Sequence, residues 1–176
     1  MLPLWDYALT VYKLPGVKDR LLALQDRHRL DVVHILWCLW AGRYGFSLSP
    51  EERIEVLKST RDMAFQATQP LRAVRKFLSG PRPGFPQEDI KSLREDVLRL
   101  EIKSEELALR RLDQTTQEAA DEPPADHGDM IARATLLFDS ARAYADTPLV
   151  IGDKETAGCA ASLFQEVCKA AQEDGP

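Results

Sequence analysis

Side chains that could bind a metal ion gather in one short stretch of the sequence. They offer carboxylate oxygens and imidazole nitrogens, which are common ligands of zinc and related metals. The four are Asp26, His28, Asp31 and His34. A structural role is the alternative: Asp31 would cap a helix, and His34 would make one buried hydrogen bond. We favour the structural role, so we predict no metal site and no cofactor.

A ligand pocket is the second candidate, because indole rings often line sites for apolar or planar ligands. The residues that would line it are Trp5, Asp6, Gln25, Asp31, His34 and Trp37. Such a pocket would make the protein a small-molecule binder or a helical enzyme. Aromatic residues at helical spacing are, however, more typical of plain core packing, which is the interpretation we favour for Trp37 and Trp40.

A basic cluster is the third candidate, formed by Arg72, Arg75 and Lys76. Guanidinium groups bind phosphates and carboxylates, so this cluster could bind an anion, an acidic partner or a nucleic acid. It could equally be a solvated helix face, or pair with the acidic second half of the chain itself. The net charge of −5 argues against coating of nucleic acid, and we expect no nucleic-acid partner.

No catalytic motif accompanies these candidates. The sequence contains no G-x-S-x-G turn, no phosphate-binding glycine loop, no H-E-x-x-H and no D-D-x-x-D pattern. An all-helical chain of this size without such motifs is more often a binding module than an enzyme. We therefore predict no catalytic residue.

The elements that would position these side chains all have the pattern of helices. No stretch alternates apolar and polar residues as a half-buried strand does. Helices are expected at residues 3–13, 17–28, 32–41, 50–79, 87–120, 129–145 and 153–171, with loops at 122–128 and around 147–148. The fold class is therefore all-α: a compact multi-helix bundle with a long helix and a C-terminal helical hairpin.

Local sequence signals indicate where two of these helices begin, where one is interrupted and which one lies at the centre of the fold. Asp31 is placed to cap the helix that follows it, which is apolar nearly all round and should lie at the centre of the fold. Ser49 and Glu52 have the spacing of a capping box. Pro70 predicts a kink or break near Thr68, because proline lacks a backbone N–H.

The long helix at 87–120 carries an apolar stripe that is longer than the rest of the chain is expected to cover. Its residues follow a three-four spacing: Ile90, Leu93, Val97, Leu100 and Leu107. The preceding helical segment is expected to bury a row of apolar residues: Ile54, Leu57, Met63 or Ala64, and Phe65 or Ala67. The pattern continues through Leu71, Val74, Phe77 and Leu78. The long stripe predicts a surface for self-association or for a protein partner.

The two halves of the chain differ in charge. Residues 1–80 contain twelve Lys and Arg and eight Asp and Glu, whereas residues 81–176 contain eleven and twenty. A Pro- and Gly-rich stretch at 81–86 separates them. We therefore predict an aromatic-rich helical core domain at 1–80, and an acidic long helix plus helical hairpin at 81–176, packed on the core.

Signals for a membrane or for secretion are not visible. The longest uncharged stretch, 32–42, has 11 residues, and a membrane span needs about 20. No basic region followed by an apolar run opens the chain, so no secretory signal is expected. The three cysteines fit neither a disulfide framework nor a zinc ligand set. We expect a cytoplasmic protein with no membrane association.

Several short motifs in the first half are similar to those of a known family. They are the W-D-Y-A string at 5–8, the L-Q-D string at 24–26, the D-V pair at 31–32 and the P-L-R segment at 70–72. Over residues 4–80 the chain resembles a family of small uncharacterised bacterial helical proteins with an N-terminal W-D-F/Y-A motif. The resemblance implies a bacterial protein, and it implies no activity, cofactor or catalytic residue.

Together these observations predict a non-enzymatic protein–protein interaction or adaptor module. Its partner would be another protein or a second copy of the chain. The alternative is a small-molecule binder or helical enzyme with its pocket near Trp5, Asp31, His34 and Trp37. A ligand retained on purification would favour that alternative.

Overall fold

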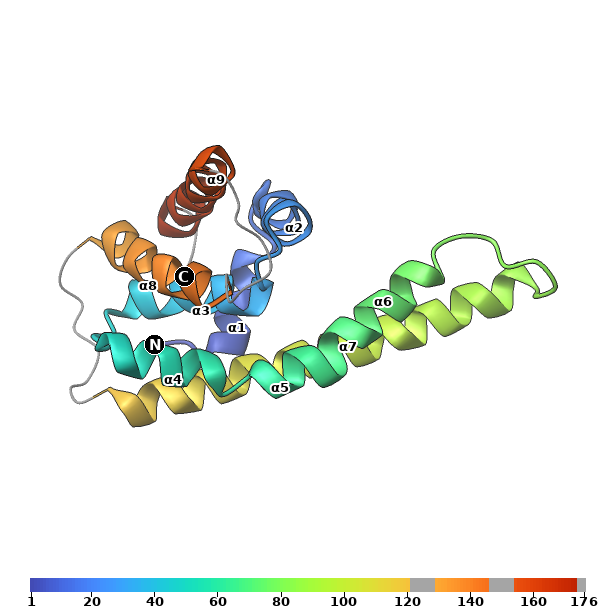
Figure 1. Cartoon of the computed structure of the whole chain (residues 1–176), viewed down its shortest axis with the longest axis horizontal. Helices are drawn as coiled ribbons and strands as arrows, with labels where there is room; N and C mark the ends of the chain where they lie inside the picture. The colour runs from blue at the N-terminus through green and yellow to red at the C-terminus, as the bar shows by residue number, and fades with distance from the viewer. Residues whose placement is uncertain (121–128, 146–153, 174–176) are drawn as a thin grey trace.

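The computed structural model describes residues 1–120, 129–145 and 154–173. Within these ranges all regular structure is helical (Figure 1). The elements are α1 (Leu4–Val11), α2 (Val17–His28), α3 (Val32–Tyr44), α4 (Pro50–Lys58), α5 (Arg61–Met63), the π-helix η1 (Ala64–Thr68), α6 (Gln69–Phe77), α7 (Gln87–Ala119), α8 (Met130–Ala145) and α9 (Lys154–Glu173). The all-α fold class is confirmed. The loops expected at 122–128 and 147–148 lie outside the described residues.

The molecule consists of a compact head and a projecting arm (Figure 1). The head contains α1 to α4, α8, α9 and the C-terminal part of α7. The arm (residues 64–107) contains η1, α6 and the N-terminal part of α7, which run antiparallel and are joined at the tip by residues 78–86. In the described part of the chain, no helix is both long and apolar enough to cross a bilayer.

The head is built around α3, which is buried from Val32 to Gly42. Trp37 and Trp40 are fully buried on this helix, as core packing predicts. A Cβ atom added at Gly42 would lie 2.7 Å from the Cβ of Ala134, so glycine allows α3 and α8 to pack closely. The C-terminal helices also pack on each other, because the rings of Phe138 and Phe164 stack with centroids 4.1 Å apart.

The predicted helix starts are confirmed. The Oδ1 of Asp31 accepts a hydrogen bond of 2.9 Å from the backbone N–H of Val33 at the start of α3. Ser49 and Glu52 form the complete capping box of α4. Each cap satisfies backbone N–H groups that the helix itself leaves unpaired.

The arm has its own small hydrophobic cluster, separate from that of the head. Leu78, Ile90 and Val97 are buried there, with Leu71 packed against them. The interruption expected before Pro70 is the π-helical turn η1, which precedes α6. A proline in a helix removes one backbone hydrogen bond, and a local change in helical pitch accommodates that loss.

The long helix α7 extends over 33 residues, within one residue of its predicted bounds. Its length is about 50 Å at 1.5 Å per residue. The C-terminal part lies in the head, where Ala108, Leu109 and Leu112 join the main core. The N-terminal part packs mainly against η1 and α6, which cover a single stripe of its surface.

Several residues expected to be buried are exposed, and these expectations were wrong. They are Ile54, Val74 and Phe77. The physical reason for all but Ile54 is the arm: two paired helices bury one face each, and the remaining apolar residues have no third helix to contact. Nothing in the structure explains the exposure of Ile54 on α4.

The main hydrophobic cluster draws on both halves of the sequence. Buried residues of α1 to α4 contact Leu109 and Leu112 of α7, Phe138 of α8 and Phe164 of α9. The Pro- and Gly-rich stretch at 81–86 lies at the tip of the arm, far from this cluster (Figure 1).

Candidate interaction surface

The polar groups of the candidate pocket on α3 have partners within the protein. Asp31 caps α3, and the Nε2 of His34 lies 3.1 Å from the Oγ1 of Thr60. Burial lowers the pKa of His34, and the charge of Asp31 only partly opposes this effect. The Nε1–H of Trp37 donates a 2.8 Å hydrogen bond to the Oγ1 of Thr116 on α7. Asp31 therefore secures the start of α3, and His34 and Trp37 tie α3 to its neighbours.

The other candidate pocket residues lie on α1 and α2. Trp5 is half-buried at the edge of the core, and Asp6 beside it is exposed. Gln25 is half-buried on α2, next to the exposed Asp26. The ligand pocket stays a prediction.

A metal site is the second possible role of this region, with Asp26, His28, Asp31 and His34 as the ligands. In the ranges that the structure describes, no three His, Cys, Asp or Glu side chains lie close enough together to hold a metal ion. The carboxylate of Asp26 instead accepts a 3.0 Å hydrogen bond from Lys76 of the arm. This ion pair links α2 to α6, and both of its side chains are exposed.

Two members of the basic cluster face the acidic helix α7. The Nε of Arg72 donates to Glu101 at 2.9 Å, and its second nitrogen donates to Glu105 at 2.6 Å. Arg75 also donates to Glu101, at 2.5 and 3.2 Å. Arg72 and Arg75 thus pair with the acidic second half of the chain itself, which was one of the alternatives for the basic cluster. Whether the cluster also binds an anion or a partner stays a prediction.

The two carboxylates of this network differ in their pKa values. Burial acts to raise the pKa of Glu101, but hydrogen bonds from Arg75 and Arg72 outweigh it and hold that pKa below its usual value. Burial raises the pKa of Glu105, and the single partner Arg72 does not compensate. Glu101 is therefore the firmly ionised centre of the network that holds α6 against α7.

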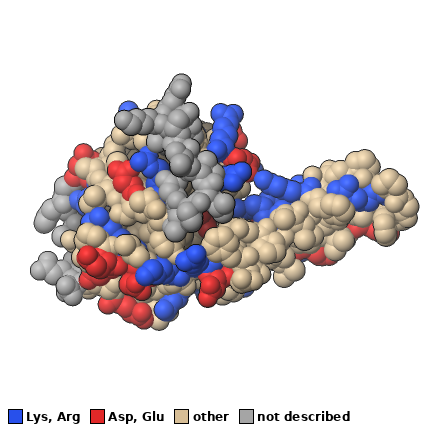
Figure 2. Space-filling model, in the orientation of Figure 1, with Lys and Arg blue, Asp and Glu red and all other residues tan. Residues whose placement is uncertain are grey.

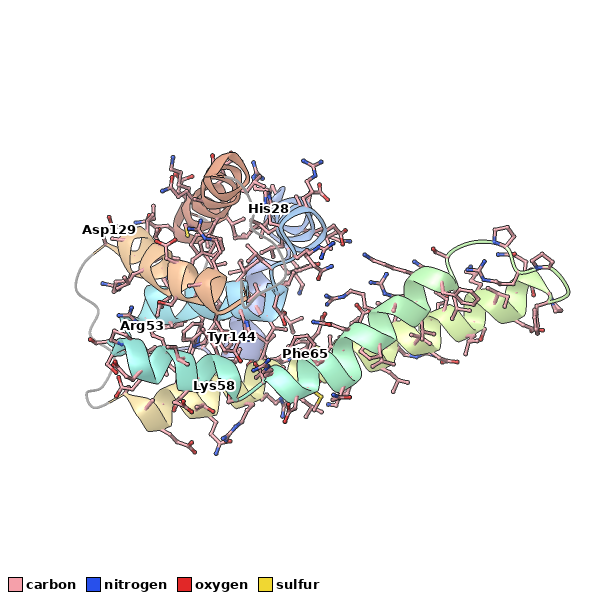
Figure 3. The ribbon with its side chains drawn as sticks, in the orientation of Figure 1. His28, Arg53, Lys58, Phe65, Asp129 and Tyr144 are labelled. Atoms are coloured by element: carbon pink, nitrogen blue, oxygen red, sulfur yellow. The ribbon has the colours of Figure 1, made fainter. Side chains whose placement is uncertain are left out.

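The arm exposes several large apolar side chains. On η1, α6 and the tip, the exposed side chains are Phe65, Val74, Phe77 and Phe85. Phe65 lies near the base of the arm (Figure 3). The side of the arm that faces the viewer in Figure 2 is mostly uncharged. Such a surface is typical of a protein that binds another protein there.

On α7 the exposed apolar residues form a row. Leu93, Leu100 and Leu107 are 49%, 57% and 46% exposed. Because they are seven residues apart, they lie on one face of the helix within about 20° per step. We call these three residues the leucine row. It runs beside the buried stripe of Ile90 and Val97 that packs against α6.

In the sequence pattern these leucines form a single stripe with Ile90 and Val97. The two rows have the three-four spacing of a coiled-coil seam, which one neighbouring helix can cover, so the spacing carried no signal that α6 would cover one row and leave the other exposed. A shallow depression of about 420 Å³ is a further feature that the sequence did not indicate. It is lined by Arg110, Asp113, Gln114, Gln117 and Glu118, near the head end of α7.

Comparison with known proteins gives one match. A family model described as a protein of unknown function (DUF2390) matches residues 3–112. The match spans α1 to α6 and most of α7, so it includes the whole arm and extends beyond the resemblance at 4–80. No curated protein and no solved structure matches the chain.

Proposed function

Because the chain belongs to this family, whose description states no activity, we propose a function from the structure: a non-enzymatic module that binds a protein through the apolar face of its arm. The observation that carries the proposal is the leucine row, three large apolar side chains about half exposed on a projecting helix. Monomeric soluble proteins rarely expose contiguous apolar patches larger than a few hundred Å².

The construction of the arm supports this proposal. The ion network of Glu101 with Arg72 and Arg75 fixes α6 on α7 without using the leucine row. A surface that is held in place before binding loses less conformational freedom when a partner docks. The head supplies the folded body from which the arm projects (Figure 1).

The proposal includes a cytoplasmic setting in a bacterium. Cys38 and Cys168 are free thiols in the interior of the head. Burial raises the pKa of both, to about 12 for Cys168, so they stay protonated and unreactive. Free thiols are typical of a reducing compartment. The bacterial origin rests on the resemblance of the first half of the chain.

Native mass spectrometry of the full chain, purified gently from its own cells, tests the proposal. The wild-type protein is expected in a complex, and Leu93→Glu is expected to remove the partner because it places a charge in the apolar face. Leu136→Glu is the matched control, since Leu136 is 53% exposed but lies on α8 in the head. A complex that survives Leu93→Glu, or a wild-type chain without any partner, would contradict the proposal.

A further inference from the structure

We propose that the protein bound by the arm is a second copy of this chain, with the two α7 helices antiparallel and Leu100 at the two-fold axis. The inference rests on the proposed function, because it names the occupant of the same apolar face. A two-fold interface uses the same patch on both copies, so the patch must be complementary to itself. Both the apolar and the charged residues of α7 meet that condition.

The leucine row is symmetric about its middle residue. Leu93 and Leu107 lie seven residues before and after Leu100. When two copies of α7 pair antiparallel about Leu100, each Leu93 therefore lies opposite Leu107 of the second copy. Leu100 meets its own counterpart, and all six leucines become buried between the helices.

A row of charged residues runs beside the leucine row and changes sign at the same point. Asp89, Asp96, Lys103 and Arg110 are also seven residues apart, and all four are exposed. The two acidic residues come before Leu100 and the two basic residues come after it. Antiparallel pairing therefore brings Asp96 of each copy near Lys103 of the other, and Asp89 near Arg110.

This arrangement of charge favours a second copy over an unrelated protein. A parallel two-fold pair would instead place the two charged rows on opposite edges of the contact, so that the acidic and basic residues could not pair with each other. A foreign partner requires no inversion of charge about Leu100, whereas an antiparallel two-fold pair does. The sequence of α7 thus meets a requirement that only self-pairing imposes.

The shape of the molecule leaves room for this pairing. The contact from Asp89 to Arg110 is about 33 Å long at 1.5 Å per residue. The head lies at one end of the long axis and the arm extends from it (Figure 1). In an antiparallel pair the two heads therefore lie at opposite ends. Since α6 accompanies α7 in each arm, the paired arms form four helices around the leucine rows.

Sedimentation equilibrium of the full chain tests the pairing. The wild-type protein is expected at twice the 19.8 kDa of one chain. Leu100→Glu is expected to weaken the dimer about 100-fold, because it places two like charges together at the axis. Ile102→Glu is the matched control: Ile102 is 45% exposed on the same helix but lies about 200° around it from Leu100, so its dimer should persist.

A charge exchange tests the antiparallel arrangement without touching a leucine. Asp96→Lys and Lys103→Glu are each expected to weaken the dimer roughly tenfold. Each substitution turns an opposite-charge pair into a like-charge pair, and the two-fold axis repeats that pair at a second place in the interface. The two substitutions in one chain are expected to restore it. Circular dichroism of each variant checks that the helices remain folded.

Three results would overturn the inference. They are a folded wild-type protein that stays monomeric at about 100 µM, a dimer unaffected by Leu100→Glu, and a double variant no tighter than its single variants. A monomer that still forms an arm-dependent complex with a different protein overturns self-pairing but leaves the proposed function intact. A dimer that ignores both Leu93→Glu and Leu100→Glu overturns both.

Discussion

Glu101 and Glu105 are four residues apart on α7, and both contact Arg72, yet their environments differ. Glu101 accepts from a second guanidinium group, that of Arg75, and is only 4% exposed. One carboxylate therefore balances two positive charges at the junction of α6 and α7. Removing one partner of such a group leaves charge without a counter-ion, which costs more than the original contacts supplied.

The variant Glu101→Gln should therefore loosen α6 from α7. We expect a loss of about 2 kcal/mol in the local stability of the arm, less than for a fully buried pair because both arginines are partly exposed. That loss corresponds to about 30-fold faster amide hydrogen exchange in α6. Glu95→Gln is the control, because Glu95 is exposed on the same helix.

The effect of Glu101→Gln should also depend on pH. The pKa of Glu101 is lowered in the folded protein, so its contribution is present above the unfolded pKa of about 4.3 and is lost as pH falls below it. The difference in exchange between wild type and variant should therefore hold from pH 7 to about pH 5 and shrink below about pH 4, as pH falls through the lowered pKa of Glu101. A difference that is the same at pH 7 and at about pH 3 would contradict this assignment.

At the scale of the elements, the sequence predicted where the helices begin and end better than it predicted which of their residues are buried. The bounds of α7, the cap at Asp31 and the capping box at Ser49 all follow from local chemistry, and all are confirmed. The exposure of Val74 and Leu100 depends instead on where the turn at 78–86 sends the chain. A wide apolar stripe indicates that a helix needs neighbours, but it does not say how many the fold provides.

The candidate site shows the same limit. Arg72 and Arg75 were recognisable as a basic cluster, and the acidic second half was recognisable as a possible counterpart. Their contacts with Glu101 depend on the antiparallel register of α6 on α7, which is set by the length of the tip and by η1. The spacing of residues within either helix does not determine that register.

The close approach of α3 and α8 can be tested with one methyl group. In Gly42→Ala the new Cβ would lie 2.7 to 2.9 Å from the Cβ, N and Cα of Ala134, and backbone atoms cannot move aside cheaply. We expect a loss of about 1–3 kcal/mol in the free energy of unfolding, measured with urea.

The matched control for Gly42→Ala is Gly80→Ala near the tip of the arm. There the nearest atom to the new Cβ is a side-chain nitrogen of Arg82, at 3.9 Å. This variant should keep its stability within about 0.5 kcal/mol of wild type. Equal losses in the two variants would show that α3 and α8 are not closely packed at Gly42.

At the scale of the whole molecule, the head and the arm have separate hydrophobic clusters. The head cluster takes residues from α1 to α4, from α7 beyond residue 107, and from α8 and α9. The arm cluster consists of Leu78, Ile90 and Val97 with Leu71. The chain passes between the two where η1 and α7 leave the head, and there Thr68 and Ser104 are hydrogen-bonded at 2.9 Å. The exposed ion pair of Lys76 with Asp26 also joins the arm to the head.

A head without the outer arm is therefore expected to fold. Replacing residues 69–100 by a four-residue Gly-Ser loop removes the arm cluster and leaves every residue of the head cluster in place. We expect cooperative thermal unfolding within a few degrees of wild type, and a monomer in sedimentation. An unfolded product would show that the head depends on the arm for its stability.

The uninterrupted course of α7 has an optical consequence. The helix passes from the arm into the head, where Thr116 accepts the hydrogen bond of the Trp37 indole at 2.8 Å. A change in how α7 lies in the head would alter the surroundings of this buried indole, on which tryptophan emission depends. The fluorescence of Trp37, measured in a chain whose Trp5 and Trp40 are replaced by phenylalanine, is therefore expected to report whether α7 stays docked in the head, without any added label.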